Sequence, residues 1–188
     1  MTKKESGIEP TDDKKLLSLF EQNKDRGLRA IMKEFQQPVY LHVRRMVVDE
    51  DDARDVIQET FINVYRYLNG FKGDSKLSTW IYRIATNECI RLLKSKKKNL
   101  PLADCESYLA TKLPVYDVED PDKILADFQK AILSLPEKQR LAFNLRYYDE
   151  LSYDEISKIT DMSVQTLKTN YHIAKEKIKK YMTNRLSR

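Results

Sequence analysis

The segment from Leu151 to Tyr181 constrains the fold of this chain most, because it carries the start and stop signals of two consecutive helices. Ser152 and Glu155 form an S-x-x-E capping box, in which a hydroxyl and a carboxylate each satisfy a backbone N–H at a helix start. A tight turn should follow, with Asp161 in a left-handed conformation. Ser163 is then expected to cap a second, longer helix. Its apolar positions recur at a helical spacing: Val164, Leu167, Tyr171, Ala174 and Ile178.

This spacing is typical of a helix-turn-helix, which places its second helix in the major groove of DNA. An ordinary helical hairpin would show the same pattern, but the charge of the second helix argues against it. Between Ser163 and Arg188, seven lysines and arginines stand against one acidic residue, Glu176. Binding of such a segment to DNA is favoured by the release of counterions.

The composition favours an all-α protein with two small helical domains. The 188 residues suffice for two domains, since domains of roughly 60 residues can fold alone. Only four glycines occur, and no run of alternating β-branched residues indicates strands. In the second half we expect helices near 123–134, 136–148, 153–159 and 163–182. Pro136 suits the first position of its helix.

The net charge of +5 suggests an anionic partner, and the cysteines indicate a reducing compartment. Cys89 and Cys105 are too few for a disulfide framework or a Cys-rich zinc site, so a cytoplasmic location fits and no metal or cofactor is expected. Cys89 is expected to be buried inside a helix bundle. We find no apolar signal core near the start and no apolar stretch of about 20 residues, so no insertion into a membrane is expected.

Composition divides the chain into two helical regions and a linker. Residues 1–13 are polar and expected to be a disordered tail, and residues 14–98 carry dense helical periodicity. Residues 99–122 contain three prolines and six acidic residues against one lysine, and are expected to form a flexible acidic linker or simply a solvated tether. Helical patterns resume over 123–184, and 185–188 form a short tail.

A helix expected over residues 51–68 has two different faces. One face is apolar and should be core: Ile57, Phe61, Val64 and Leu68. The opposite face is mostly acidic and amide, with one isoleucine in its middle: Asp55, Gln58, Glu59, Ile62 and Arg66. A solvated helix face would look similar. The isoleucine among carboxylates favours an interface with a basic partner.

The next expected helix, over residues 76–98, is basic. Its inner positions include Trp80, Ile81, Ile84, Ala85, Cys89 and Leu92. A stripe of cations with one amide runs along its outside: Arg83, Asn87, Arg91, Lys94 and Lys98. Such a stripe suits phosphates together with one base edge.

The loop over residues 69–76 is the most glycine-rich stretch of the chain, with small polar side chains and two lysines. It is suited to holding an unstacked base by hydrogen bonding and stacking. A plain turn between helices is the alternative. For Phe71 and Trp80, core packing is the preferred interpretation over base stacking.

Three stretches together resemble the extracytoplasmic-function group of bacterial sigma factors, within the sigma-70 family. They are DARDVIQETFINVYRYL (residues 52–68), FKGDSKLSTWIYRIATNECIRLLKSKK (71–97) and the segment 133–178. The resemblance extends from Leu16 to Met182, with the motifs in the right order and at the right separations. It implies a sigma-two domain over 14–98, a linker, and a sigma-four domain over 123–184.

The resemblance also implies a function without catalysis: reversible binding to core RNA polymerase and recognition of promoter DNA. The helix 51–68 would dock on an arginine-rich coiled coil of the β′ subunit, and the sigma-four domain would sit on the flap of the β subunit. The core-polymerase-binding residues would be Asp55, Gln58, Glu59 and Ile62. The linker would pass through the active-site cleft and RNA exit path of the polymerase.

Two DNA surfaces are implied in the same way. The minus-ten element would be melted and read as a single strand, with Asn87 near the captured base. The residues for this are Phe71, Lys72, Asp74, Ser75, Lys76, Trp80, Arg83, Asn87, Arg91 and Lys94. The minus-thirty-five element would be read in the major groove by Gln165, Thr166, Lys168, Thr169, Asn170, His172 and Lys175.

The chain departs from the family pattern in the second of these surfaces. Asn170 and Ile173 stand where the family usually has arginines, and Asp161 replaces a turn glycine. Amides pair with the edge of adenine, so Gln165 and Asn170 suggest adenine where arginine would read guanine. Simple polar surface is the alternative for both.

Other functions fit the residues less well. A stand-alone helix-turn-helix regulator would need a dimer surface, and no heptad stretch supplies one. An enzyme acting on nucleic acid lacks a visible catalytic set, since His42 and His172 lie far apart in sequence. The acidic cluster 49–55 suggests an interface more than a metal site. As in many relatives, a one-to-one complex with a cognate anti-sigma factor is expected for an otherwise monomeric protein.

Overall fold

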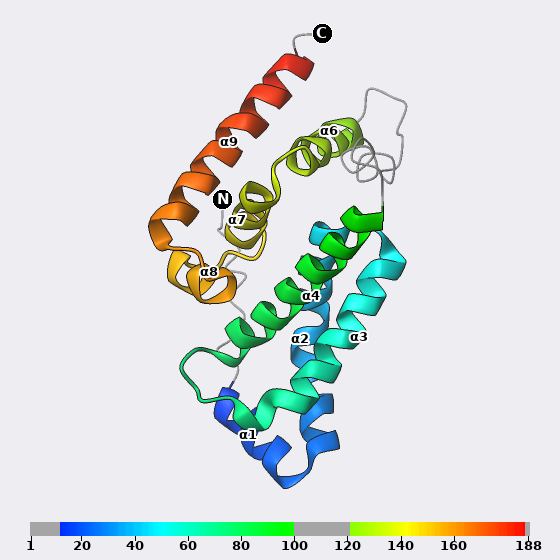
Figure 1. Cartoon of the computed structure of the whole chain (residues 1–188), viewed down its shortest axis with the longest axis vertical. Helices are drawn as coiled ribbons and strands as arrows, with labels where there is room; N and C mark the ends of the chain where they lie inside the picture. Colours follow the sequence, from blue (N-terminus) through cyan, green and yellow to red (C-terminus); the bar gives the residue numbers. More distant parts are fainter. Residues whose placement is uncertain (1–11, 100–120, 187–188) are drawn as a thin grey trace.

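The computed structural model of the protein describes residues 12–99 and 121–186. These residues form α-helices and one 3-10 turn, without strands, as the all-α prediction requires (Figure 1). The elements are α1 (Asp13–Gln22), α2 (Lys24–Val47), α3 (Glu50–Tyr67), η1 (Leu68–Gly70), α4 (Leu77–Asn99), α6 (Pro121–Leu133), α7 (Glu137–Tyr147), α8 (Tyr153–Thr160) and α9 (Val164–Leu186). Most of the predicted tail 1–13 and of the linker 99–122, including Cys105, lies outside the described residues.

The first half is a bundle of α1 to α4, in which α2 packs against each of the other three helices. Its buried side chains include Phe20, Ile31, Met46 and Ile81. The chain reverses between α1 and α2 at Asn23, whose side chain accepts a hydrogen bond from the backbone N of Arg26 and so caps α2.

Two close contacts hold α1 in this bundle. A Cβ added to Gly27 would lie 2.2 Å from the Cα of Phe20, so the start of α2 meets the backbone of α1 without room for a side chain. The carboxylate of Asp13, at the start of α1, accepts a hydrogen bond of 2.8 Å from the backbone N of Leu77. The first turn of α4 is therefore capped by a residue that is distant in sequence.

The second half packs α6 and α7 against the long helix α9. Its own apolar cluster includes Ile132, Leu135, Phe143 and Ile178. The helices agree with the predicted ranges to within a few residues at each end. The predicted place of Pro136 is wrong: its extended ψ of 146° makes it the N-cap residue, and the helix begins at Glu137.

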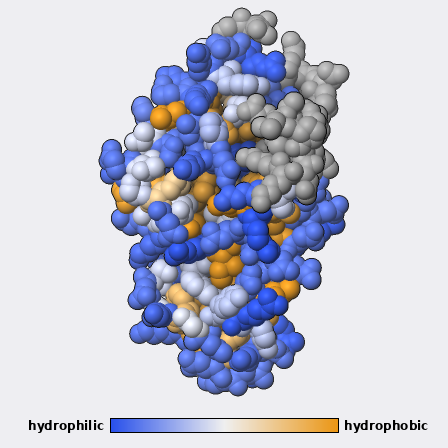
Figure 2. All heavy atoms as spheres, viewed as in Figure 1, coloured by the Kyte–Doolittle hydropathy of each residue, from blue (hydrophilic) through white to orange (hydrophobic). Residues whose placement is uncertain are grey.

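The two halves pack against each other, which sequence analysis did not anticipate. One continuous cluster of buried residues joins Met46 and Ile81 of the first half to Leu145, Ile156 and Ile159 of the second. Helix α8 packs against α4, and α7 packs against α2; Figure 1 shows α8 at the side of the bundle that carries α4. On the outer surface seen in Figure 2, hydrophobic side chains occur in small patches among hydrophilic ones. The apolar surface of each half is thus partly used to hold the other.

Candidate functional site

The helix-turn-helix predicted near the C-terminus is present, with the local signals in the expected roles. The Ser152 N donates to the Glu155 carboxylate at 3.0 Å, and the Glu155 N donates to the Ser152 hydroxyl at 3.2 Å. Asp161 ends α8 with φ of 56° and ψ of 16°, so it adopts the predicted left-handed conformation. These contacts confirm the capping box and the turn.

The second helix of the motif is capped and anchored as predicted. The Ser163 hydroxyl accepts a hydrogen bond of 3.1 Å from the backbone N of Thr166. Leu167, Ala174 and Ile178 are buried on one side of α9. The turn is closed by the Ser157 hydroxyl, which donates to the Met162 carbonyl at 2.7 Å.

The residues predicted for the minus-thirty-five element lie on the opposite side of α9. Exposed side chains are Gln165, Thr166, Lys168, Thr169, His172 and Lys175, whereas Asn170 is half-buried. The hydroxyl of Thr169 donates to the Gln165 carbonyl at 3.0 Å, so it is already engaged within the helix. Gln165, Lys168, His172 and Lys175 are thus the predicted residues whose exposed side chains form no hydrogen bond within the helix in the described part of the chain.

The cationic stripe of α4 is exposed as predicted, but part of it has protein partners. Arg83, Asn87, Arg91 and Lys94 are all exposed. Arg91 forms an ion pair with Glu88, one turn before it on the same helix. Arg83 instead reaches the second half of the chain, as described below. The side chain of Lys98 lies outside the described residues.

An aromatic residue of the loop before α4, Phe71, packs on the bundle together with Trp80 of α4. The rings of Phe71 and Trp80 lie 5.5 Å apart, and both are half-buried against the core. This agrees with the core packing that was preferred for these two residues. Lys72 and Asp74 are exposed, and Gly73 has φ of 76°, a conformation that favours glycine. The loop thus exposes the charged side chains of Lys72 and Asp74 to solvent, next to the packed rings of Phe71 and Trp80.

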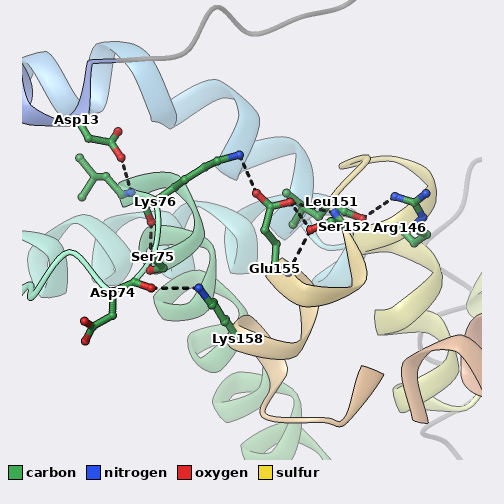
Figure 3. Close-up of polar contacts among 10 residues, drawn as sticks. Asp13, Asp74, Ser75, Lys76, Arg146, Leu151, Ser152, Glu155 and Lys158 are labelled. Carbon is green, nitrogen blue, oxygen red and sulfur yellow. Dashed lines mark hydrogen bonds and ion pairs between the residues drawn. The ribbon is translucent and has the colours of Figure 1, made fainter. Parts of the chain in front are cut away.

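The helix-turn-helix and the predicted minus-ten surface meet directly (Figure 3). Lys76 Nζ lies 2.9 Å from Glu155 Oε1, and Lys158 Nζ donates to the Asp74 carbonyl at 3.0 Å. Burial acts to raise the pKa of the Glu155 carboxyl. Hydrogen bonds from Lys76 and from Ser152 outweigh that effect and hold the pKa below its ordinary value.

A third contact extends this junction along α4. Arg83 Nη2 lies 2.8 Å from Asp161 Oδ2 and 3.0 Å from Asp161 Oδ1. The three contacts together join the start of α4, and the loop before it, to α8 and its turn. From sequence, Asp74, Lys76 and Arg83 had been assigned to DNA, and Glu155 and Asp161 to a cap and a turn. Lys158 had not been assigned a role.

A buried polar network lies beneath this junction. His42 of α2 is fully buried, with Nδ1 2.8 Å from Asp149 Oδ2 and Nε2 3.0 Å from Thr86 Oγ1. Arg45 Nη1 donates to Asp149 Oδ1 at 3.0 Å, and the Asp149 side chain is 3% exposed. Burial and then the Asp149 carboxylate raise the pKa of Tyr82, whose ring lies 5.1 Å from that of His42.

Sequence analysis missed this network, because no local pattern connects its members. His42 and Asp149 are separated by 107 positions; His42 lies within a helix, and Asp149 lies in the connection between α7 and α8. Asn144 adds to the same contact, since its side-chain N donates to the Arg45 carbonyl at 3.3 Å. The network fixes the α7–α8 connection against α2 and α4.

The predicted core-polymerase face lies at the other side of the bundle, on α3. Asp55, Gln58 and Glu59 are exposed, and Ile62 is half-buried. Beside them α2 and α3 form a groove of about 680 Å³, largely apolar, whose lining includes Gln58 and Ile62. Helix α2 contributes residues that were not predicted: Leu28, Met32, Gln36 and Tyr40. Their spacing of four residues is a signal that was available in the sequence.

The acidic residues at the start of α3 have structural partners. The Asp49 carboxylate accepts hydrogen bonds of 3.1 Å from the backbone N of Asp51 and of Asp52, and so caps the helix. Asp52 also pairs with Lys96 of α4 at 2.5 Å. Within residues 12–99 and 121–186, no three potential ligand side chains gather as a metal site would require.

Cys89 is buried in the bundle, as predicted, and burial raises the pKa of its thiol to about 12. A thiol in this setting is protonated and unreactive at neutral pH. No helix in the described part of the chain has the length and apolarity needed to cross a membrane.

Sequence comparison finds the same family that the motifs suggested. The family model "Sigma-70 region 2" matches residues 31–99, and "Sigma-70, region 4" matches residues 125–178. An RNA polymerase sigma-H factor of Pseudomonas aeruginosa is 31% identical over 178 residues, which cover 89% of this chain and 92% of the relative. An ECF RNA polymerase sigma-E factor of Escherichia coli K12 is 31% identical over 180 residues, covering 90% and 94%.

Two solved structures with a similar fold are complexes with a partner protein, and one of them is a sigma factor bound to an anti-sigma factor. The sigma factor RpoE in complex with NepR from Bartonella quintana matches with a TM-score of 0.67 at 18% identity, over 82% of this chain and 96% of that one. CnrH in complex with the cytosolic domain of CnrY matches with a TM-score of 0.68 at 16% identity, over 92% and 97%. At these identities the likeness concerns the fold.

Proposed function

Because the chain belongs to the sigma-70 family and is an alternative sigma factor of the extracytoplasmic-function type, we propose that it directs core RNA polymerase to promoters by binding alone, without a catalytic step. The observation that supports this best is the separation of its surfaces. A basic helix-turn-helix, a basic stripe on α4, and a pair of exposed carboxylates on α3 beside a largely apolar groove between α2 and α3 occupy different parts of one chain.

Core polymerase would dock on the acidic face of α3 and the groove beside it. Asp55 and Glu59 are exposed and negative, which suits an arginine-rich helix of the β′ subunit. The groove would receive apolar side chains of the same partner, and burial of such a core inside a polar rim is typical of protein interfaces. Interaction with the β flap would involve the sigma-four half.

Charge reversal tests this docking. The Asp55→Lys/Glu59→Lys variant should bind core polymerase more weakly and keep its helical fold, because exposed substitutions cost little stability. A Glu21→Lys/Asp25→Lys variant changes the charge equally at exposed positions of α1 and α2 and should bind normally. Equal affinities for both variants and the parent would remove the basis for the assignment.

The minus-ten element would be bound by the loop before α4 and by the stripe on α4. Lys94 would contact phosphate, so Lys94→Ala should weaken all promoters similarly and reduce the salt dependence of binding. Asn87 would read a base, so Asn87→Ala should change the preference among minus-ten sequences. A promoter library that showed the same uniform loss for both variants would contradict these separate roles.

The minus-thirty-five element would be read from the exposed side of α9. A bidentate amide–adenine pair discriminates between bases by roughly 1–3 kcal/mol. Arginine at position 170 would add a positive charge and would pair with guanine instead of adenine. Asn170→Arg should therefore strengthen non-specific DNA binding and move the selected upstream sequence toward guanine. Selection of identical upstream elements by parent and variant would show that this position does not read bases.

We further propose an anti-sigma factor as a one-to-one partner, because a similar solved structure is a sigma factor in complex with an anti-sigma factor. The site of action would be the cytoplasm, where core polymerase works. Promoter-dependent RNA synthesis by core polymerase with and without this chain tests the whole proposal. A stand-alone regulator would bind DNA in the same assay but leave RNA synthesis independent of the chain.

A further inference from the structure

Tyr67, the last residue of α3, has no role in the surfaces described above, although it is open to solvent. It is 60% exposed, which is more than any other large hydrophobic residue in the described part of the chain. Only η1 separates it from the loop 71–76, which belongs to the predicted minus-ten surface. Tyr67 therefore places an exposed aromatic ring at the border of that surface.

Two contacts define which side of α3 faces α4. Asp52 Oδ2 pairs with Lys96 Nζ, and the side-chain N of Asn63 donates to Glu88 Oε1 at 3.1 Å. Residue numbers rise along α3 where they fall along α4, so the two helices lie side by side and antiparallel (Figure 1). Tyr67 follows Asn63 by four residues, and residues at this spacing are neighbours on one helix face. Tyr67 thus lies on the side of α3 that faces α4, one turn closer to the loop.

The part of α4 level with Tyr67 is the part that carries Asn87. One turn before Glu88 stands Ile84, which is half-buried against the core. Asn87 follows Ile84 by three residues and Trp80 precedes it by four, so these three residues share one side of α4. Asn87 is exposed there. The geometry brings Tyr67 to the edge of the surface on which Asn87 is expected to read a base.

The other two aromatic side chains at this surface are packed against each other. The rings of Phe71 and Trp80 lie 5.5 Å apart, and both residues are half-buried against the core. A base that leaves the duplex is held by stacking on an aromatic ring, a contact that every base can make. Of these three rings, that of Tyr67 is the most open to such a base.

We propose that Tyr67 stacks on an unstacked base of the minus-ten strand. This inference rests on the proposed function, which supplies the single strand. It gives α3 a contact with DNA on the side opposite to its contact with core polymerase. The cations Arg91 and Lys94, exposed on the same side of α4 as Asn87, would hold the phosphates of the strand.

Tyr65 provides a matched control on the same helix. Residues two apart on a helix do not face the same side. The ring of Tyr65 lies 5.9 Å from that of Phe20, and Tyr65 lines the groove between α2 and α3. It is 38% exposed. Tyr65→Ala therefore removes the same kind of side chain from the surface of α3 without changing the side that faces α4.

The stacking is tested with a forked promoter DNA and the complex of the full chain with core polymerase. The fork presents the minus-ten sequence selected from the promoter library as a single strand, and one base at a time is replaced by an abasic site. Each affinity is divided by the affinity of the same variant for the intact fork. This ratio cancels any change in polymerase binding, which matters for Tyr65 because it lines the groove.

In the parent, an abasic site at the stacked position should weaken binding about tenfold, whereas in Tyr67→Ala the same abasic site should have no effect. Tyr67→Ala should also bind the intact fork about tenfold more weakly than the parent. Tyr67→Phe keeps the ring and should behave like the parent, and Tyr65→Ala should show the losses of the parent at every position. Circular dichroism should find all variants folded, because exposed substitutions cost little stability.

Equal losses in the parent and in Tyr67→Ala at every abasic position would overturn the inference. The same would follow if Tyr65→Ala also became insensitive at one position, or if Tyr67→Phe behaved like Tyr67→Ala, since the ring would then not be the contact. Promoter-dependent RNA synthesis by the parent is measured on the same promoter. Its absence would refute the proposed function and this inference with it, whereas synthesis without coupling at Tyr67 would overturn this inference alone.

Discussion

Replacing Asp149 by alanine should reveal how much the contact between the two halves stabilises the protein. This carboxylate makes a buried bond of 2.8 Å to His42 and a bond of 3.0 Å to Arg45, whose side chain is 28% exposed. A hydrogen bond to a charged group contributes about 1.5–3 kcal/mol, and the half-exposed partner adds less than about 1 kcal/mol. Alanine also leaves a buried ring nitrogen of His42 without its partner. We therefore expect the free energy of unfolding to fall by about 3 kcal/mol.

Guanidinium titration and a thermal scan measure this change. For a chain of this size each kcal/mol moves Tm by about 2–4 °C, so Asp149→Ala should lower Tm by about 6–12 °C. Trp80 is the only tryptophan and lies in the first half, so its fluorescence should follow the same transition as circular dichroism in the parent. The exposed Asp154→Ala serves as control. A change below about 0.5 kcal/mol for Asp149→Ala, as for an ordinary surface substitution, would refute the reasoning.

The remaining predictions concern single residues. The lowered pKa of Glu155 stabilises the folded protein at pH values above the ordinary glutamate pKa of about 4.3, and this stabilisation is lost as the pH falls through the lowered pKa. Glutamine at this position does not titrate. The free energy of unfolding, measured from neutral pH to about pH 3, should therefore depend less on pH in Glu155→Gln than in the parent. Gly27→Ala should lower Tm, because its Cβ would lie 2.2 Å from the backbone of Phe20, whereas Gly70→Ala, with nothing within 4 Å, should change Tm little. Mass spectrometry after brief alkylation should find Cys89 unmodified in the native protein and modified after unfolding, and rapid native modification would contradict its burial.

Local features of this fold were predictable from sequence because their physical causes are local. The capping box of Ser152 and Glu155 and the left-handed turn at Asp161 depend on residues a few positions apart. The two faces of α3 follow from helical periodicity, which does not depend on the partner. Pro136 was misplaced by one position, because proline fits both an N-cap and the first turn, and periodicity does not distinguish them.

Contacts between distant parts of the chain were not predictable in the same way. His42 and Asp149 carry no pattern that pairs them, and the only guide was that a buried histidine needs a partner. Arg83 was assigned to DNA because an exposed cation on a basic helix looks the same whether its partner is a phosphate or a carboxylate. The α2 side of the groove was not predicted, because only the charges of α3 indicated an interface, whereas Leu28, Met32 and Tyr40 of α2 carry no charge.

The hydrogen bond between Asp13 and the backbone N of Leu77 has a consequence for the order in which the chain folds. Its partners are 64 positions apart, so the first turn of α4 lacks this cap until α1 has returned to that end of the bundle. The chain between the two residues must be ordered, at a cost in conformational entropy, before this hydrogen bond can form. We therefore expect the first turn of α4 to form late in folding. Exchange of the Leu77 amide hydrogen should therefore report the docking of α1, and loss of Asp13 should be felt first at the loop 71–76, far along the chain from the lesion.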